Sequence, residues 1–234
     1  MDATHNVVKN SHSDQDFSKG LAVTILVGVI GFVTLSMLVS RMFWVANGRS
    51  RDDFVVFALL PTIYFYLMLF CLIVLGRASP RFVTLDYTWF HWTRSEVKRW
   101  LLLPLGLLLI AGVMSPFFYI LHFPHQNLVS IHNDNHGMPF ATIRVIQGVL
   151  IAPVLEELLW RGYVQGTLVR VLGAWTGIIG QASLFALMHF EPLMGGIQLF
   201  LMGLLFGVWR HSRKTILPLI LAHILNNALH ALTN

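Results

Sequence analysis

Several stretches of this chain are apolar over about 20 residues, and they constrain the fold more than any other feature. A stretch of that length can cross the hydrocarbon core of a bilayer as one α-helix, because a helix satisfies its own backbone hydrogen bonds. Composition agrees, since 56% of the 234 residues are hydrophobic and only 12% are charged. A soluble domain carries about a quarter charged residues. The expected fold class is all-α, a polytopic transmembrane helical bundle.

The chain is expected to cross the membrane about seven times. An interfacial helical connection is expected after the second span, where basic residues alternate with tryptophan and phenylalanine as in a headgroup zone. We divide the chain into a polar N-terminal tail (1–19) and a single multi-pass membrane domain (20–234), whose catalytic core is expected at about 141–234. The predicted spans are about 20–40, 54–75, 100–121, 142–171, 174–190, 192–209 and 216–232.

The charged residues between the spans predict a location and exclude one class of partner. The formal charge of +5 comes without a basic run interleaved with aromatic residues, so nucleic acid is not an expected partner. Lysine and arginine concentrate in the tail and in the connections on the side of the N-terminus, which predicts a cytoplasmic N-terminus. The polar tail does not resemble a cleavable signal peptide. These features are compatible with a bacterial inner-membrane protein.

Two adjacent carboxylates, Glu156 and Glu157, stand inside an apolar stretch where a membrane helix is expected. Ionisable groups inside a membrane are costly, so they suggest a functional site. Glu157 and Arg161 are four residues apart and share a helix face, with the acid first, which is the favoured order for such a pair. Glu156 is rotated by about 100° from its neighbour. We therefore expect arginine to hold one carboxylate while the other stays free for chemistry.

Three further polar residues stand in later spans. His189 ends the span expected over 174–190, and His223 and Asn227 share one face of the last span. A polar group that faced lipid would be unsatisfied, so these side chains are expected to turn inward and meet the glutamates.

Such a cluster supports more than one function. Glu156, His189 and His223 are a plausible zinc set by ligand type. In a metal-free alternative, a carboxylate acts as general base towards water, His189 orients the water, and His223 and Asn227 donate to the developing oxyanion. The residues alone leave both hypotheses open. They also allow a non-catalytic membrane protein that binds a peptide or partner. A third possibility is a transporter or metal-handling protein that uses the glutamates and histidines, with uptake dependent on the connection from His122 to His136.

Other intramembrane protease chemistries fit the sequence less well. The chain contains no His-Glu-x-x-His zinc motif and no Gly-x-Ser-x-Gly serine motif. No pair of aspartates stands within the expected spans, since Asp86 and Asp134 fall in expected connections, so an aspartyl protease is not indicated.

Three short motifs follow one another in the chain, namely Glu156-Glu157-x-x-x-Arg161, Phe185-x-x-x-His189 and His223-x-x-x-Asn227. Their order resembles the CPBP family, the CAAX-processing and bacteriocin-processing (Abi) proteins that include the Rce-type prenyl-protein endopeptidases. The resemblance covers about residues 149–228, and no catalytic position is missing.

The resemblance implies an all-helical intramembrane glutamic endopeptidase that uses no metal and no other cofactor. It implies that Glu156 activates water together with His189, and that His223 and Asn227 form the oxyanion hole. Glu157 and Arg161 would support the site. The implied partners are the lipid bilayer and a membrane-associated protein or peptide substrate. A prenylated C-terminal tetrapeptide is expected if the host prenylates proteins, and a leader peptide, pheromone or lipoprotein-like tail if it does not.

Overall fold

The computed structural model describes residues 20, 22–35, 38–39, 42, 67, 71, 94–120, 145–189 and 193–233. The predicted polar tail, nearly all of the second span, the connection up to residue 93 and the histidine-rich connection lie outside the described residues. The division into a tail and one membrane domain therefore stays a prediction.

Helices make up the regular structure of the described part, and the predicted all-α fold class is confirmed. Four consecutive segments without a break form one long helix, called here the motif helix, and the residues from Ala22 to Leu35 are also helical. The bounds are α3 (Arg94–Trp100), α4 (Leu102–Ile120), the motif helix with η1 (Ile146–Ile151), α6 (Ala152–Glu157), η2 (Leu158–Val164) and α7 (Gln165–Leu172), then α8 (Ala174–Met188), α9 (Leu193–Arg213) and α10 (Leu217–Thr233).

These bounds agree with the predicted third to seventh spans to within a few residues. Two helical stretches, Val97–Met114 and Leu193–Arg213, are long and apolar enough to cross a membrane by length and composition. Three apolar helices are shorter, namely Ala22–Leu35, Ala174–Met188 and Leu217–Leu232. The number of seven spans therefore stays a prediction.

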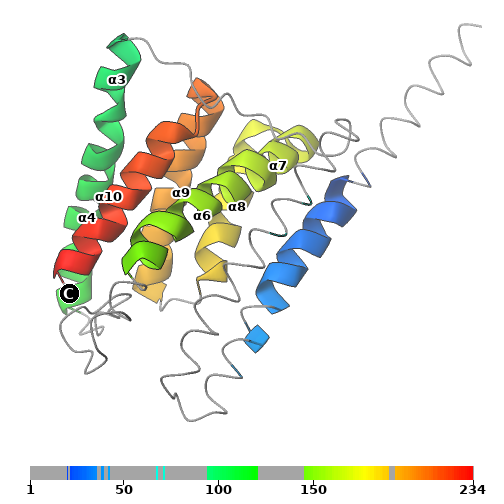
Figure 1. The fold of residues 1–234 in the computed structure, drawn as a ribbon, viewed down its shortest axis with the longest axis horizontal. Helices are drawn as coiled ribbons and strands as arrows, with labels where there is room; N and C mark the ends of the chain where they lie inside the picture. Colours follow the sequence, from blue (N-terminus) through cyan, green and yellow to red (C-terminus); the bar gives the residue numbers. More distant parts are fainter. Residues whose placement is uncertain are drawn as a thin grey trace, which may run out of the picture.

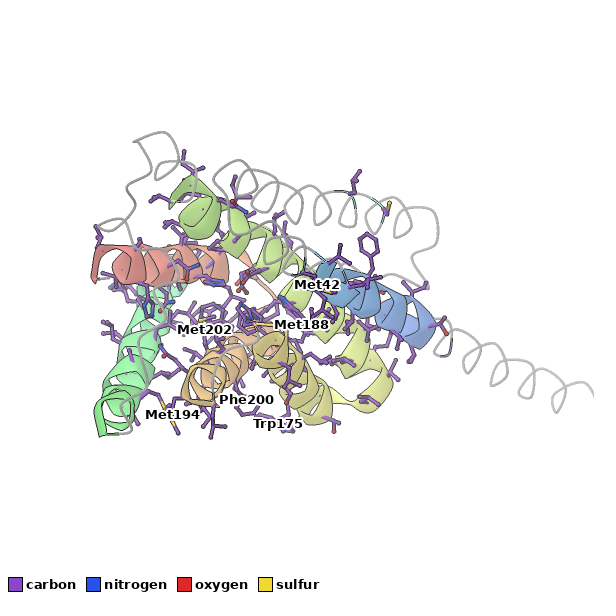
Figure 2. All side chains as sticks on the ribbon, turned by 90° about the horizontal axis from the view of Figure 1, so that it is seen from below. Met42, Trp175, Met188, Met194, Phe200 and Met202 are labelled. Atoms are coloured by element: carbon purple, nitrogen blue, oxygen red, sulfur yellow. The ribbon has the colours of Figure 1, made fainter. Side chains whose placement is uncertain are left out.

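Helix α4 has one face buried in the bundle and another face that is apolar and exposed. Leu103 is fully buried and Leu107 is 7% exposed, whereas Leu105 and Leu109 are 58% and 67% exposed. An apolar surface of this kind is unusual for a soluble monomer and suits contact with lipid. Figure 2 shows the same contrast elsewhere, because Met188 and Met202 point into the bundle while Trp175 lies at its edge.

The motif helix is not a uniform α-helix. Its segments η1 and η2 are π-helical, and they flank the α-helical turn that carries both glutamates. The Ala152 N–H donates to Gln147 O, five residues back, and Pro153 follows with no N–H of its own. A π-helical turn therefore stands directly ahead of Pro153. Such π segments frequently occur at functional sites.

Glycines let the later helices pack closely. Gly173 ends the motif helix at φ 87°, a conformation that residues with a side chain rarely adopt, and its N–H donates to Val169 O. The chain then turns back into α8. A Cβ on Gly177 would lie 2.5 Å from the Val169 backbone nitrogen, and one on Gly203 would lie 3.0 Å from Ala182. The helices can approach this closely at both positions because glycine has no side chain.

Contacts between elements place α9 against α8 and α4, and α10 against α4, α6 and η1. Figure 1 shows α10 running between α4 and the motif helix, so the last helix lies directly beside the glutamates. The buried apolar core beneath includes Leu159, Trp160, Phe185 and Phe206.

Candidate active site

The paired glutamates end α6, where the motif helix faces α8 and α10. Glu157 is completely buried, whereas the Glu156 side chain keeps 21% of its surface exposed. The two adjacent carboxylates therefore differ in exposure, since Glu157 is enclosed and Glu156 is accessible.

Glu157 joins two helices through one oxygen. Its Oε1 accepts a hydrogen bond from Arg161 Nη1 at 3.0 Å and another from His223 Nδ1 at 2.9 Å. An ionised carboxylate can only accept, so the His223 Nδ1 carries a proton in this contact. The first bond is the predicted i,i+4 pair, and the second attaches α10 to the motif helix.

Arg161 is completely buried and is enclosed by aromatic rings as well as by Glu157. Its guanidinium carbon lies 4.3 Å from the centroid of the Phe185 ring and 5.2 Å from that of Phe206. Both distances suit cation–π contacts. A buried ion pair gives little net stability, but the loss of one partner leaves the other charge without compensation.

Glu156 faces two imidazole rings. Its Oε2 lies 3.8 Å from His189 Nε2 and 3.8 Å from His223 Nε2. These separations exceed a direct hydrogen bond and are short enough for one water molecule to bridge. Glu156 is thus the carboxylate that two histidines from different helices surround.

His189 is oriented by the backbone of its own helix. Its Nδ1 lies 2.7 Å from Phe185 O, and a carbonyl oxygen can only accept, so the Nδ1–H donates. In the neutral ring the other nitrogen, Nε2, is then an acceptor that faces Glu156. The Phe185 ring also packs against the imidazole, with centroids 4.6 Å apart.

Asn227 joins the site differently from the other predicted residues. Its Nδ2 donates to Gly148 O at 2.9 Å, and its Oδ1 accepts from Asn226 Nδ2 at 3.3 Å. The structure therefore links Glu156, Glu157, Arg161, His189 and His223 through side-chain contacts, and attaches Asn227 through the backbone of η1.

Nothing in the sequence marks Phe206 or Gly148 as part of the site, or indicates a role for the Phe185 ring. Phe206 is completely buried on α9, a helix without a motif, and its ring lies near Arg161 and 6.1 Å from that of His223. A lone phenylalanine in an apolar span carries no distinguishing signal. Gly148 contributes only a carbonyl, which sequence cannot reveal.

The zinc hypothesis gains no support from this arrangement. Among the residues that the structure describes, no group of three or more histidine, cysteine, aspartate or glutamate side chains has the arrangement of a metal site. The histidines between His122 and His136 are not among the residues that the structure describes.

Comparison with known proteins agrees with the resemblance in the motifs. Residues 138–229 match the family model described as "Rce1-like: Type II CAAX prenyl endopeptidase Rce1-like". This stretch contains the motif helix, α8, α9 and most of α10. No curated protein and no solved structure shows significant similarity to the chain.

The match confirms the predicted family and the predicted enzyme class. Proteins of this family are membrane proteins, and the apolar helices of the chain fit that location. Residues 138–229 are similar to the Rce1-like family of type II CAAX prenyl endopeptidases, and this match supports the CAAX protease family and the peptidase class for the chain.

Proposed function

We propose that the protein is an intramembrane, metal-free glutamic endopeptidase that hydrolyses a peptide bond of a membrane-associated protein or peptide. One observation carries the proposal: a partly exposed carboxylate, Glu156, lies 3.8 Å from the Nε2 atoms of both His189 and His223. A carboxylate and imidazoles in a largely buried site are suited to general acid–base chemistry.

Glu156 is the proposed general base. A water molecule between Glu156 Oε2 and His189 Nε2 gives a proton to the carboxylate, and its oxygen bonds to the carbonyl carbon of the substrate. The tetrahedral intermediate then breaks its C–N bond, and the proton held by Glu156 passes to the leaving nitrogen. His189 holds the water, because its Nδ1–H is committed to Phe185 O and its Nε2 faces the carboxylate.

His223 and Asn227 are the proposed donors to the developing oxyanion. His223 donates its Nδ1–H to Glu157, so it can donate from Nε2 only when both ring nitrogens carry protons. Asn227 uses one N–H for Gly148 O and retains a second for the oxyanion. Glu157 and Arg161 support this arrangement by holding His223 in place.

The proposed substrate follows from the family description. The family description names a CAAX prenyl endopeptidase. The proposed substrate is therefore a prenylated C-terminal tetrapeptide if the host prenylates proteins, and a leader peptide, pheromone or lipoprotein-like tail if it does not. Location in a bacterial inner membrane with a cytoplasmic N-terminus belongs to the same proposal.

Replacement of Glu156 tests the proposal most directly. Glu156→Gln keeps the shape of the side chain and removes the base, so turnover should fall by at least about 100-fold. The measurement is comparative peptidomics of membranes that contain the wild type or the variant, followed by kinetics on the substrate found. Glu96→Gln, on α3 and outside the family match, is the matched control and should retain turnover.

Full turnover by Glu156→Gln on a confirmed substrate would refute the glutamic mechanism. A cellular phenotype that survives this substitution would instead indicate a binding protein. The same assay after thorough zinc chelation should show no loss, and a loss that added zinc restores would favour a zinc enzyme.

A further inference from the structure

The carbonyl oxygen of Gly148 lacks both partners that a regular helix would supply. In an α-helix it would accept from the N–H of residue 152, and in a π-helix from that of residue 153. The Ala152 N–H donates to Gln147 O instead. Pro153 has no N–H. The π-helical turn and the proline together leave this carbonyl open to a donor from another helix.

Asn227 on α10 supplies that donor. Its Nδ2 lies 2.9 Å from Gly148 O, between residues 79 positions apart in the chain. The orientation of the amide follows from chemistry, because a carbonyl can only accept and the nitrogen must therefore face it. The bond from Asn226 Nδ2 to Asn227 Oδ1 agrees with the same orientation.

Helix α10 is thus attached to the motif helix at two points. Asn227 binds the Gly148 carbonyl in η1, on the N-terminal side of Pro153. His223, one turn earlier on α10, binds Glu157 on the C-terminal side of Pro153. Two attachments on one helix restrict both its rotation and its sliding along its neighbour. They therefore restrict where the His223 Nε2 and the second N–H of Asn227 lie relative to Glu156.

We propose that Pro153 is a positioning residue. By withholding an N–H, it reserves the Gly148 carbonyl for Asn227 and so holds the two proposed oxyanion donors in place. This inference rests on the proposed function, and it assigns a role to two residues outside the three motifs.

Pro153→Ala tests the inference, because alanine restores a backbone N–H that can donate to Gly148 O. The new N–H would then compete with Asn227 for the Gly148 carbonyl. We expect kcat to fall about tenfold while KM changes less than about twofold. The thermal midpoint should not fall, because proline inside a helix is unfavourable. Pro104→Ala, on α4, is the matched control and should leave kcat unchanged.

A double-mutant cycle separates this role from a general effect of proline. Asn227→Ala should lower kcat about 30-fold or more in the wild-type background, but less than about threefold further in the Pro153→Ala background. Equal losses in the two backgrounds, or full activity of Pro153→Ala, would overturn the inference.

A resting-state measurement decides the case if Pro153→Ala does not accumulate in membranes. Without substrate, Asn227→Ala should have a thermal midpoint several degrees below that of Asn226→Ala, because only the former leaves Gly148 O without a donor. Equal midpoints would overturn the inference. Inactive Glu156→Gln together with fully active Pro153→Ala would refute this inference alone, whereas fully active Glu156→Gln would refute the proposed function.

Discussion

Glu156 and Glu157 differ by one position in the chain and have different surroundings. The buried Glu157 accepts from Arg161 and His223 through one oxygen, whereas the partly exposed Glu156 faces two imidazole nitrogens at distances that a water molecule can bridge. The rotation between adjacent helical residues separates the two side chains. One carboxylate can therefore hold the site together while the other remains available to a substrate.

Arg161→Lys should destabilise the protein although the charge is retained. A lysine can still reach Glu157, but it lacks the planar group that lies over the Phe185 and Phe206 rings. We expect a loss of roughly 2 kcal/mol in the free energy of unfolding, measured by thermal or denaturant unfolding in detergent.

Arg213→Lys is the matched control for this prediction. Arg213 also lies over an aromatic ring, 6.0 Å from the centroid of Trp209, but its side chain is exposed. Its replacement should change stability by less than about 0.5 kcal/mol. Similar losses from the two substitutions would show that burial between the two phenylalanines contributes nothing specific.

The motif helix alternates between π- and α-helical segments, and this alternation determines what each of its neighbours can contact. The π-helical turn in η1 leaves a carbonyl for α10, and α6 carries both glutamates. Six successive residues of η2, from Leu159 to Val164, are buried, so other elements enclose this part of the helix on all sides. At its end, Gly173 permits the sharp return into α8 that brings His189 back to Glu156.

The α7–α8 contact gives a prediction at the scale of elements. Gly177→Ala would place a Cβ 2.5 Å from backbone atoms of Val169, which cannot move without separating the two helices. We expect a loss of at least about 2 kcal/mol and reduced turnover, because α8 carries His189. Unfolding midpoints and kinetics of the purified variant provide the measurement.

Gly180→Ala, on the same helix, separates this effect from the general effect of a new methyl group. A Cβ there would lie 3.6 Å from a Leu168 side-chain atom, which is an ordinary contact. The variant should be as stable as the wild type or more stable by up to about 1 kcal/mol, because alanine favours a helix. Equal destabilisation by both substitutions would contradict the packing argument.

For the molecule as a whole, α3 and the C-terminal ends of α7 and α9 reach one end of the bundle (Figure 1). Basic residues stand in the last turns of these three helices and directly after α9. These residues are Lys98, Arg99, Arg170, Arg210, Arg213 and Lys214. The C-terminal end of α10 lies at the opposite end of the bundle (Figure 1). The positive-inside rule therefore predicts that the basic end faces the cytoplasm.

Cysteine labelling can test this orientation. In a variant in which serine replaces Cys71, Arg213→Cys should react with a membrane-impermeant thiol reagent only after the cytoplasmic face is opened. Leu232→Cys, at an exposed position near the end of α10, should react in intact cells or spheroplasts. The reverse pattern would place the basic end outside and reject the predicted orientation.

The sequence by itself determined the helical class, the bounds of the later helices and the bond between Glu157 and Arg161. Each of these depends on residues close together in the chain, through apolar length or through the four-residue repeat of a helix face. The family match also follows from sequence, because it needs only the order and spacing of the motifs.

Tertiary structure alone decided how Glu156 meets His189 and His223, and that His223 shares Glu157 with Arg161. The bond from His223 to Glu157 joins residues 66 positions apart, and that from Asn227 to Gly148 joins residues 79 positions apart. Such distances depend on how whole helices rotate and approach, which in turn depends on glycine contacts, on the π-helical turn before Pro153 and on the Phe206 ring. No local repeat in the sequence predicts how these helices are placed, because each contact involves a partner from a different part of the chain.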